Sequence, residues 1–160
     1  VLPEDKLDGM LVYTADKNGE GDRYFCKDGK IQRESDDGSR DSRYPKEDDH
    51  ELDVPLAVLV NGNSASASEV FTGAVMDYDA GIVVGTTTFG KGIVQNLIPL
   101  GDGTAIKLTT AHYYTPNGFD LHGKGLEPDV VVEMDGELQK KAVVELSEDN
   151  QLQAAIEAMN

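Results

Sequence analysis

The sequence predicts one domain of the mixed α/β or α+β class, and three observations support that prediction. The 160 residues are enough to bury one hydrophobic core. Two short apolar runs, residues 55–60 and 82–85, are typical of strands buried in a parallel sheet. Other segments alternate apolar and polar residues around Gly and Asp turns, which indicates antiparallel hairpins, or have helical spacing. We therefore expect strands of both kinds with two or three packed helices.

The first 53 residues are predicted to form short strands and a charged surface loop. "GMLVYTAD" (residues 9–16) and "RYFCKDGKIQRES" (residues 23–35) alternate apolar and polar side chains around turn residues, which predicts partly solvated hairpins. The following "SDDGSRDSRYPKEDDHE" (residues 35–51) contains almost nothing apolar. We expect it to be a mobile loop, a variable insertion without chemistry of its own.

Residues 54–133 are predicted to be the core, because they contain only 8 acidic and 3 basic residues. The run "PLAVLV" (residues 55–60) is predicted to be a strand buried on both faces, and "NGN" ends it. A helix is expected from Ser66 to Gly81, a glycine placed to stop it. Its apolar residues recur at helical spacing: Val70, Phe71, Ala74, Val75 and Tyr78.

The remaining elements are predicted to be strands and one short helix. "IVVG" (residues 82–85) is a second buried strand, and "GIVQNLIPL" and "TAIKLTTAHYYT" flank the turn "GDG" as a hairpin. "DVVVE" (residues 129–133) is a last strand. Residues 134–160 form a C-terminal segment with a short helix, and its predicted apolar face consists of Leu152, Ile156 and Met159.

Composition argues against several classes of function. The formal net charge of −16 and the isoelectric point near 4.3 disfavour nucleic acid or an anionic membrane as partner, since both would be repelled. Cys26 is the only cysteine, so neither an internal disulfide nor a thiolate metal cluster can form. No apolar run approaches the roughly 18 residues that span a bilayer. The chain begins "VLPEDKLDG", without an initiator Met or signal sequence, so we expect it to be part of a longer protein.

The stretch "GTTTFGKG" (residues 85–92) comes within one residue of a phosphate-binding loop. Such a loop needs Ser or Thr after its lysine and a helix that opens there. Gly92 has no hydroxyl, and the β-branched "IVQNLIPL" that follows predicts a strand, so a nucleotide site is disfavoured. The simplest alternative is a tight backbone bend at Gly90 and Gly92 that leaves Lys91 as a solvated charge.

Ser66 follows a predicted strand and a turn of small residues, and it opens the predicted helix. Unpaired N–H groups at a helix N-terminus stabilise an oxyanion, so a hydroxyl here suits a nucleophile. The structural alternative is a capping box of Ser66 with Glu69, a device that stabilises a helix by about 1 kcal/mol. Spacing alone favours the capping role, and it leaves Ser64 and Ser68 as competitors for either role.

A serine nucleophile needs a base, and the sequence offers histidines and lysines. A Ser-His-Asp triad has little support, because no obvious orienting carboxylate accompanies any of the histidines: His50, His112 and His122. A lysine can replace histidine where burial favours the neutral amine. Lys91 is predicted to be the most buried lysine, ahead of Lys107 and Lys124. Gln95, four residues on, would share a strand face with Lys91 and orient its amine.

Four ordered segments resemble the catalytic core of the C-terminal processing peptidases, also called tail-specific proteases. They are "LVNGNSASASEVFTGAVMD", "VVGTTTFGKGIVQ", "IKLTTAHYYTPNG" and "HGKGLEPDVVVE". The match runs from about Val54 to Glu133, half of the chain. The resemblance implies a ClpP/crotonase-like core, in which helices pack on a mixed sheet, and makes residues 1–160 a partial protease catalytic domain.

The resemblance also implies roles for individual residues. The nucleophile would be Ser66, the middle serine of S-A-S-A-S-E, and the general base would be Lys91, the lysine of F-G-K-G. Gln95 would hold the lysine, and the backbone N–H of Ala67 would be one oxyanion donor. A serine-type endopeptidase is implied, which cleaves polypeptides at or near their C-terminal tails through an acyl-enzyme and needs no metal or organic cofactor.

Two family features do not occur in these residues. Family members usually carry an upstream N-P-G-G turn whose glycine is the second oxyanion donor, and a PDZ domain that captures the C-terminus of the substrate. Loss of one oxyanion donor costs about 100- to 1000-fold in rate. Two expectations therefore stay open for the 160 residues: they are nearly inactive alone, or they need the upstream parts to fold. The alternative function is a non-catalytic protein-binding or assembly module with the same fold.

The resemblance finally implies a setting and partners. An extracytoplasmic location is expected, in a bacterial periplasm or cell envelope or as a secreted protein, with any membrane anchor outside this chain. Polypeptide substrates and an upstream PDZ domain in the parent chain are the expected partners, and oligomerisation stays open.

Overall fold

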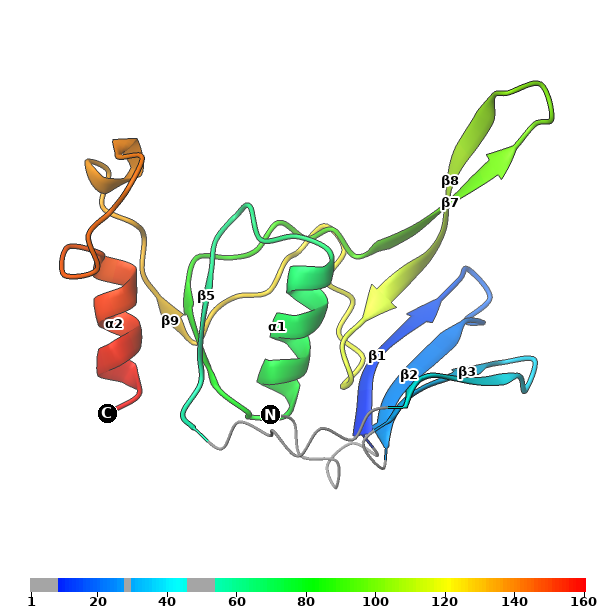
Figure 1. Cartoon of the computed structure of the whole chain (residues 1–160), viewed down its shortest axis with the longest axis horizontal. Coiled ribbons are helices and arrows are strands. Elements are labelled where there is room, and N and C mark those ends of the chain that lie inside the picture. The colour runs from blue at the N-terminus through cyan, green and yellow to red at the C-terminus, as the bar shows by residue number, and fades with distance from the viewer. Residues whose placement is uncertain (1–8, 28–29, 46–53) are drawn as a thin grey trace.

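The computed structural model describes residues 9–27, 30–45 and 54–160, which form two β-sheets and two α-helices (Figure 1). One sheet is parallel and the other is antiparallel. Helix α1 (Ala67–Asp77) lies between the two sheets, and helix α2 (Asn150–Ala158) lies on the far side of the parallel sheet (Figure 1). The mixed fold class predicted from the sequence is confirmed.

The parallel sheet carries the hydrophobic core. Its strand order is β5-β6-β9, and the bounds are β5, Ala57–Val60; β6, Ile82–Gly85; β9, Val130–Val131. Helix α1 connects β5 to β6, as a crossover between parallel strands requires. The buried hydrophobic side chains of the described residues lie in this sheet, its two helices and the turn before β9: Val60, Ala74, Val75, Tyr78, Val83, Val84, Leu121, Leu126 and Ala155.

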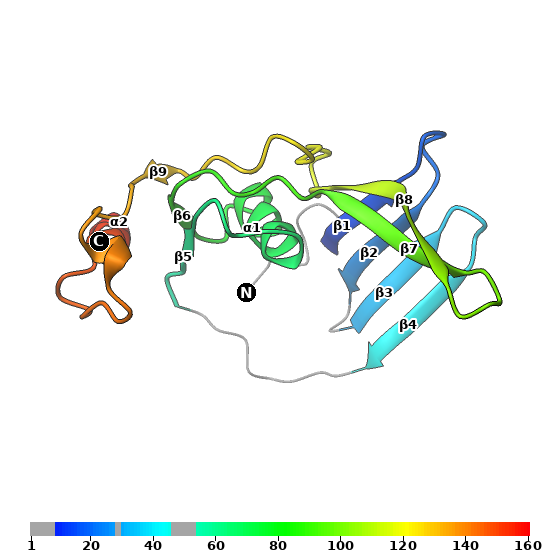
Figure 2. The ribbon, with the colours of Figure 1, turned by 90° about the horizontal axis from the view of Figure 1, so that it is seen from above.

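The second sheet has six antiparallel strands in the order β4-β3-β2-β1-β8-β7. The bounds are β1, Met10–Ala15; β2, Asp22–Lys27; β3, Lys30–Ser35; β4, Arg40–Pro45; β7, Ile93–Pro99; β8, Ala105–Tyr114. Strand β8 pairs with β1 only at its last residues, from His112 to Tyr114. The outer part of the hairpin, residues 95–109, therefore extends away from the body of the molecule (Figures 1 and 2). We call it the β7–β8 arm.

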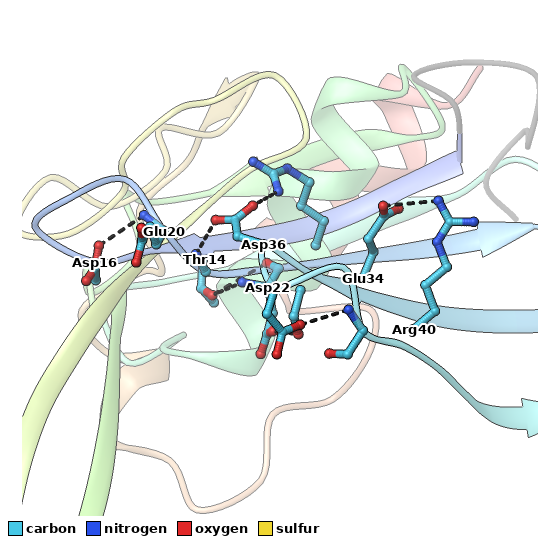
Figure 3. Close-up of polar contacts among 12 residues, drawn as sticks. Thr14, Asp16, Glu20, Asp22, Glu34, Asp36 and Arg40 are labelled. Carbon is cyan, nitrogen blue, oxygen red and sulfur yellow. Dashed lines mark hydrogen bonds and ion pairs between the residues drawn. The ribbon is translucent and has the colours of Figure 1, made fainter.

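Charged and polar contacts hold the turns of the antiparallel sheet (Figure 3). The Arg23 guanidinium donates to Asp36 Oδ1 at 2.5 Å, and the Gly21 N–H donates to Asp36 Oδ2 at 2.8 Å. The hydrogen bond from Arg23 and that from Gly21 hold the pKa of Asp36 below its usual value. Such exposed pairs contribute little to stability, because water and salt screen the charges.

The charged segment 35–51 is more ordered than expected over its first part. Residues 40–45 form β4, which pairs with β3 in register Glu34↔Arg40. An edge strand needs no apolar face, and the Arg40 guanidinium lies 3.1 Å from Glu34 Oε1, so opposite charges sit across the two strands. The prediction of an irregular loop is wrong for these residues, and residues 46–51 lie outside the described part of the chain.

One burial prediction is also wrong, and the apolar face of α2 is only partly covered. Strand β5 was expected to be buried on both faces, but Leu59 is 43% exposed, because β5 is an edge strand whose sole neighbour among the described strands is β6. The predicted apolar face of α2 is half exposed at Ile156 and Met159. The helix instead buries Ala155 and Gln151, whose amide donates to the Val132 carbonyl at 2.7 Å. Among the described residues, neither helix has the length and apolarity of a membrane span.

Candidate active site

Ser66 sits where the chain passes from β5 into α1, at the N-cap of the helix. Its backbone has φ 57° and ψ −115°, a left-handed conformation that non-glycine residues rarely adopt. Such a conformation costs about 1–3 kcal/mol and persists only where surrounding contacts enforce it. Strained backbone of this kind is concentrated at functional sites, so the conformation strengthens the case for Ser66 as the nucleophile.

The predicted capping interaction between Ser66 and Glu69 is present, and it involves the backbone N–H and carbonyl of Ser66. Glu69 Oε2 accepts the Ser66 N–H at 2.9 Å, and the Glu69 N–H donates to the Ser66 carbonyl at 2.9 Å. The Ser66 side chain also faces the Glu69 N–H, as a capping box requires, but without the geometry of a full hydrogen bond. Its competitor Ser64 accepts the Asn61 N–H at 3.1 Å and so stabilises the turn after β5. Ser64 therefore has a structural role, which leaves the hydroxyls of Ser66 and Ser68 for chemistry.

A pocket of about 310 Å³ opens beside Ser66. Helix α1 forms one wall and strands of the antiparallel sheet form the others, and the lining residues are Val12, Thr14, Asp22, Tyr24, Ser66, Ala67, Val70, Val94 and Tyr113. Burial raises the pKa of the Tyr24 hydroxyl, and the charge of Asp22 raises it further, so Tyr24 is neutral at physiological pH. The pocket is mostly apolar, with polar groups that can orient a bound chain.

Ala67 also lines this pocket, as the first residue of α1. The first N–H groups of a helix have no partner within the helix, and that of Ala67 makes no hydrogen bond to the described residues. A free N–H beside the Ser66 hydroxyl could donate to an oxyanion formed there. The oxyanion role that the family resemblance implies for Ala67 stays a prediction.

Glu69 is fully buried and accepts hydrogen bonds from two segments of the chain, the start of α1 and residues 88–91. Its Oε1 accepts the Thr88 hydroxyl and the Gly90 N–H, both at 2.6 Å. Its Oε2 accepts the Ser66 N–H at 2.9 Å and the Lys91 N–H at 2.8 Å. We call these residues, Ser66, Glu69, Thr88, Gly90 and Lys91, the Glu69 network. Because one oxygen bonds both Ser66 and Lys91, the backbones of the two predicted catalytic residues are neighbours.

Close packing of two glycine-rich turns positions Lys91. Gly90 has φ 83°, and a Cβ there would lie 2.9 Å from the Gly125 nitrogen. A Cβ on Gly92 would lie 2.9 Å from the His122 nitrogen. Both glycines are thus needed for the approach of the 121–125 turn, as the tight-bend interpretation predicts. A strand, β7, follows Lys91 instead of a helix, so the phosphate-loop alternative is wrong.

The structure differs from the sequence prediction in how Lys91 and Gln95 are placed. Lys91 is exposed, because it precedes β7 in a surface turn, and not buried as expected. Gln95 is exposed too, and its Nε2 donates to Thr109 Oγ1 at 3.3 Å. Lys91 precedes β7, which begins at Ile93, so the shared strand face of Lys91 and Gln95 stays a prediction. No hydrogen bond joins Gln95 to Lys91, or Lys91 Nζ to the Ser66 hydroxyl, among the described residues.

One histidine does have a carboxylate partner, which the sequence did not reveal. His112 Nδ1 lies 3.2 Å from Asp120 Oδ2, and Asp120 Oδ1 accepts the His122 N–H at 3.0 Å. Burial alone would raise the pKa of Asp120, but the contacts with His122 and His112 outweigh it and hold the pKa below its usual value. His112 and Asp120 line another pocket of about 460 Å³ to which Ser66 does not contribute. No hydrogen bond joins His112 or His122 to the Ser66 hydroxyl among the described residues, so the triad gains no support, and His50 lies outside those residues.

Further residues of the site had no clear signal in the sequence. Thr88, Leu126 and the pocket residues of β1, β2 and β8 come from segments far from Ser66 along the chain. Glu69 was detectable through the spacing of a capping box, but its bonds to Thr88, Gly90 and Lys91 were not. No group of three or more His, Cys, Asp or Glu side chains in the described residues is arranged to hold a metal ion.

Comparisons with known proteins establish the family. The sequence model of peptidase family S41 matches residues 6–132, and the chain therefore belongs to peptidase family S41. The chain is 54% identical over 79 residues to the carboxy-terminal-processing protease of Bartonella bacilliformis, an alignment that covers 49% of this chain and 18% of that protein. It is 52% identical over 80 residues to a probable CtpA-like serine protease of Staphylococcus epidermidis, covering 50% of this chain and 16% of that protein.

Solved structures agree with this assignment. The photosystem II D1 C-terminal processing protease superposes with a TM-score of 0.61 at 38% identity, over 78% of this chain and 28% of that one. A putative S41 protease from Bacteroides fragilis superposes with a TM-score of 0.62 over 99% of this chain and 38% of that one, and at 17% identity it shows the fold alone. The chain thus spans less than a third of the two curated relatives and of the D1-processing protease.

Proposed function

We propose that this chain carries the nucleophile and the general base of a serine endopeptidase that cleaves polypeptides at or near their C-terminal tails. One observation carries the proposal: Glu69 Oε2 bonds the backbones of both Ser66 and Lys91, beside a pocket that Ser66 and Ala67 line. The names of the relatives, carboxy-terminal-processing and D1 C-terminal processing protease, support this substrate class. Membership of peptidase family S41 supports the reaction type.

The reaction would proceed through an acyl-enzyme. Ser66 Oγ attacks the carbonyl carbon of the scissile peptide bond while the neutral Lys91 amine takes the hydroxyl proton. The carbonyl oxygen becomes an oxyanion, to which the Ala67 N–H donates. The C–N bond then breaks, Lys91 returns the proton to the leaving amine, and Ser66 holds the acyl group. Water, deprotonated by Lys91, releases the new carboxylate and restores the hydroxyl.

Lys91 and Gln95 would reach their working arrangement when a substrate lies across the site. Hydrogen bonds at catalytic sites often tighten only once substrate is bound. A polypeptide over Lys91 would withdraw its amine from water, which favours the neutral form that a base requires. The Gln95 amide, now 3.3 Å from Thr109, would then orient the amine.

The setting and partners of the whole protein follow the same proposal. We expect an extracytoplasmic location, polypeptide substrates, and a PDZ domain that presents the C-terminus of the substrate, with oligomerisation still open. The second oxyanion donor would come from polypeptide outside the 160 residues. The pocket of about 310 Å³ would receive the side chain that precedes the cleaved bond.

The competing function is a protein-binding module with the same fold, and the exposed Lys91 without a bond to the Ser66 hydroxyl favours it. The test is cleavage of a loosely folded protein, read by mass spectrometry. Two proteins are assayed: this chain, and a chimera in which the 79 aligned residues replace their counterparts in the Bartonella protease. We expect cleavage at least by the chimera, and its loss on Ser66→Ala. Cleavage that survives Ser66→Ala, or its absence from both folded proteins, would favour the binding module.

A further inference from the structure

The buried carboxylate of Glu69 has more hydrogen-bond partners than a helix cap needs. In a capping box the glutamate accepts one hydrogen bond from the N-cap N–H, here that of Ser66 at 2.9 Å. The three other donors come from residues 88–91, about twenty positions along the chain: Thr88, Gly90 and Lys91. A carboxylate is an acceptor with two oxygens, and here each oxygen has two donors. Glu69 therefore joins two segments rather than closing one helix.

Thr88 extends these contacts to a third segment. It is 5% exposed, its hydroxyl donates to Glu69 Oε1 at 2.6 Å, and the same hydroxyl accepts the Leu126 N–H at 2.8 Å. The Thr88 N–H also donates to the Leu126 carbonyl at 3.0 Å. The turn that packs against Gly90 and Gly92 is thus connected to Glu69 through one hydroxyl. A chain of bonds in a dry interior is stronger and more directional than its members in water.

We propose that Glu69 and Thr88 are a positioning pair, which sets the distance and direction of Lys91 relative to Ser66 and touches neither the substrate nor the reacting atoms. Two features of the geometry point to it. Lys91 is exposed and its side chain has no partner among the described residues, so its backbone bond to Glu69 and the close packing of Gly90 and Gly92 are what place it. Ser66 has a strained backbone whose N–H is held by the same oxygen. The inference rests on the proposed Ser66–Lys91 chemistry.

The chemistry of each substitution is specific. Glu69→Gln keeps the shape but replaces one acceptor oxygen with an NH₂ group, which would face two N–H or O–H donors. Thr88→Val keeps the shape and removes the hydroxyl, which leaves the Leu126 N–H without a partner and Glu69 Oε1 with one donor fewer. Thr88→Ser restores the hydroxyl. Misplacement of catalytic groups by about 1 Å costs on the order of 100-fold in rate.

The experiment uses whichever protein shows Ser66-dependent cleavage, the chain or the chimera. We expect Glu69→Gln to lower kcat about 100-fold and Thr88→Val about 10-fold, with KM changed less than about 3-fold, because positioning acts on the chemical step. Thr88→Ser should recover most of kcat. The labelling rate of Ser66 by a fluorophosphonate should fall in parallel with kcat.

A matched control separates positioning from mere stability. Thr72 is another buried threonine, 1% exposed, whose hydroxyl donates to the Ser68 carbonyl at 2.8 Å and does not touch Glu69. Thr72→Val should lower the Tm about as much as Thr88→Val does and leave kcat unchanged. The inference is overturned if Thr88→Val keeps kcat within about 2-fold of the wild type, or if its loss only matches the fraction unfolded. If Glu69→Gln does not fold, the comparison of Thr88→Val with Thr72→Val is sufficient to test the inference. Absence of any Ser66-dependent cleavage would instead refute the proposed function.

Discussion

The Glu69 network and the β7–β8 arm are adjacent in sequence, yet they are held in opposite ways. In the network, Glu69 and Thr88 are almost completely buried, and four donors satisfy one carboxylate. In the arm, apolar side chains face solvent, with Leu97 70% exposed and Leu108 49% exposed. The arm is stabilised mainly by pairing of its own two strands. Buried polar contacts thus hold the residues that position Lys91 and Ser66. The β7–β8 arm, a few residues further along the chain, depends on the pairing of its own two strands.

The two sheets repeat this difference on a larger scale. The buried hydrophobic residues of the described chain lie in the parallel sheet, its helices and the adjoining turn, and none of them belongs to a strand of the antiparallel sheet. Ser66 is attached to the buried sheet through β5 and α1, while the strands β1, β2 and β8 contribute walls of its pocket. The candidate nucleophile therefore has a rigid support, and the pocket beside it has walls that are easier to move.

The largest expected difference between the Glu69 network and the β7–β8 arm is in kcat, and a lysine-to-alanine substitution in each region measures it. Lys91→Ala should lower kcat about 1000-fold, within the range of a lost general base, because no other amine lies on the Glu69 network. Lys107→Ala is the matched control, an exposed lysine in the arm that should leave kcat unchanged. Steady-state cleavage of the same protein substrate measures both. Equal effects of the two substitutions would remove Lys91 from the mechanism.

A second comparison concerns stability. Val83 is completely buried in β6, so Val83→Ala should lower the free energy of unfolding by about 2 kcal/mol through lost burial and a residual cavity. Leu97→Thr in the arm should change it by less than about 0.5 kcal/mol, because the side chain is already in water. Urea unfolding followed by circular dichroism measures both. A large loss in the arm variant would show that this surface is covered in solution.

The third comparison tests the strain at Ser66. Both Ser66→Gly and Ser66→Ala remove the nucleophile, but only glycine adopts φ 57° without a steric cost. We expect Ser66→Gly to be about 1 kcal/mol more stable than Ser66→Ala, the strain that remains after the extra chain entropy of glycine is deducted. Thermal unfolding of the two inactive variants gives the difference. A higher Tm for Ser66→Ala than for Ser66→Gly would contradict the positive φ at this position.

The smallest expected effect depends on pH and involves Asp120. Its pKa is lowered in the folded state, so its stabilising contribution is present above the unfolded value of about 3.9 and is lost as pH falls through the folded value. Asp120→Asn removes that contribution. The Tm difference between wild type and variant should therefore shrink when pH is lowered from about 6 to about 3. A difference that stays constant over this range would show that Asp120 is not paired.

Local sequence patterns predicted most helices and strands of the fold, but not which of them become neighbours or which side chains are buried. Helix α1, the β7–β8 hairpin and the strand β6 follow from spacing and turn residues, and the structure contains them. The exposure of Leu59 and the burial of Gln151 depend on which strands and helices become neighbours, which local spacing does not specify. Strand β4 forms although its residues are charged, because β3 supplies hydrogen bonds and opposite charges across the pair.

The sequence supplied candidate site residues but not their arrangement in space. Ser66, Ala67, Lys91 and Gln95 were identified through a family resemblance, and the roles of these four residues remain predictions. Burial of Lys91 was inferred from apolar neighbours in sequence, but these neighbours begin a strand that leads away from the turn. Capping-box spacing indicated Glu69, but its bonds to residues 88–91 depend on two distant segments that meet in space, which no local pattern predicts.

The central claim is that Ser66 is a nucleophile activated by Lys91, and covalent labelling tests it most directly. The wild-type chimera, its Lys91→Ala variant and its Lys107→Ala variant are treated with a fluorophosphonate, and the modified residue is located by peptide mass spectrometry. We predict rapid modification of Ser66 in the wild type and in Lys107→Ala, and a loss of at least about 100-fold in labelling rate in Lys91→Ala. Labelling at another serine, or at Ser66 with the same rate in all three proteins, would contradict the account.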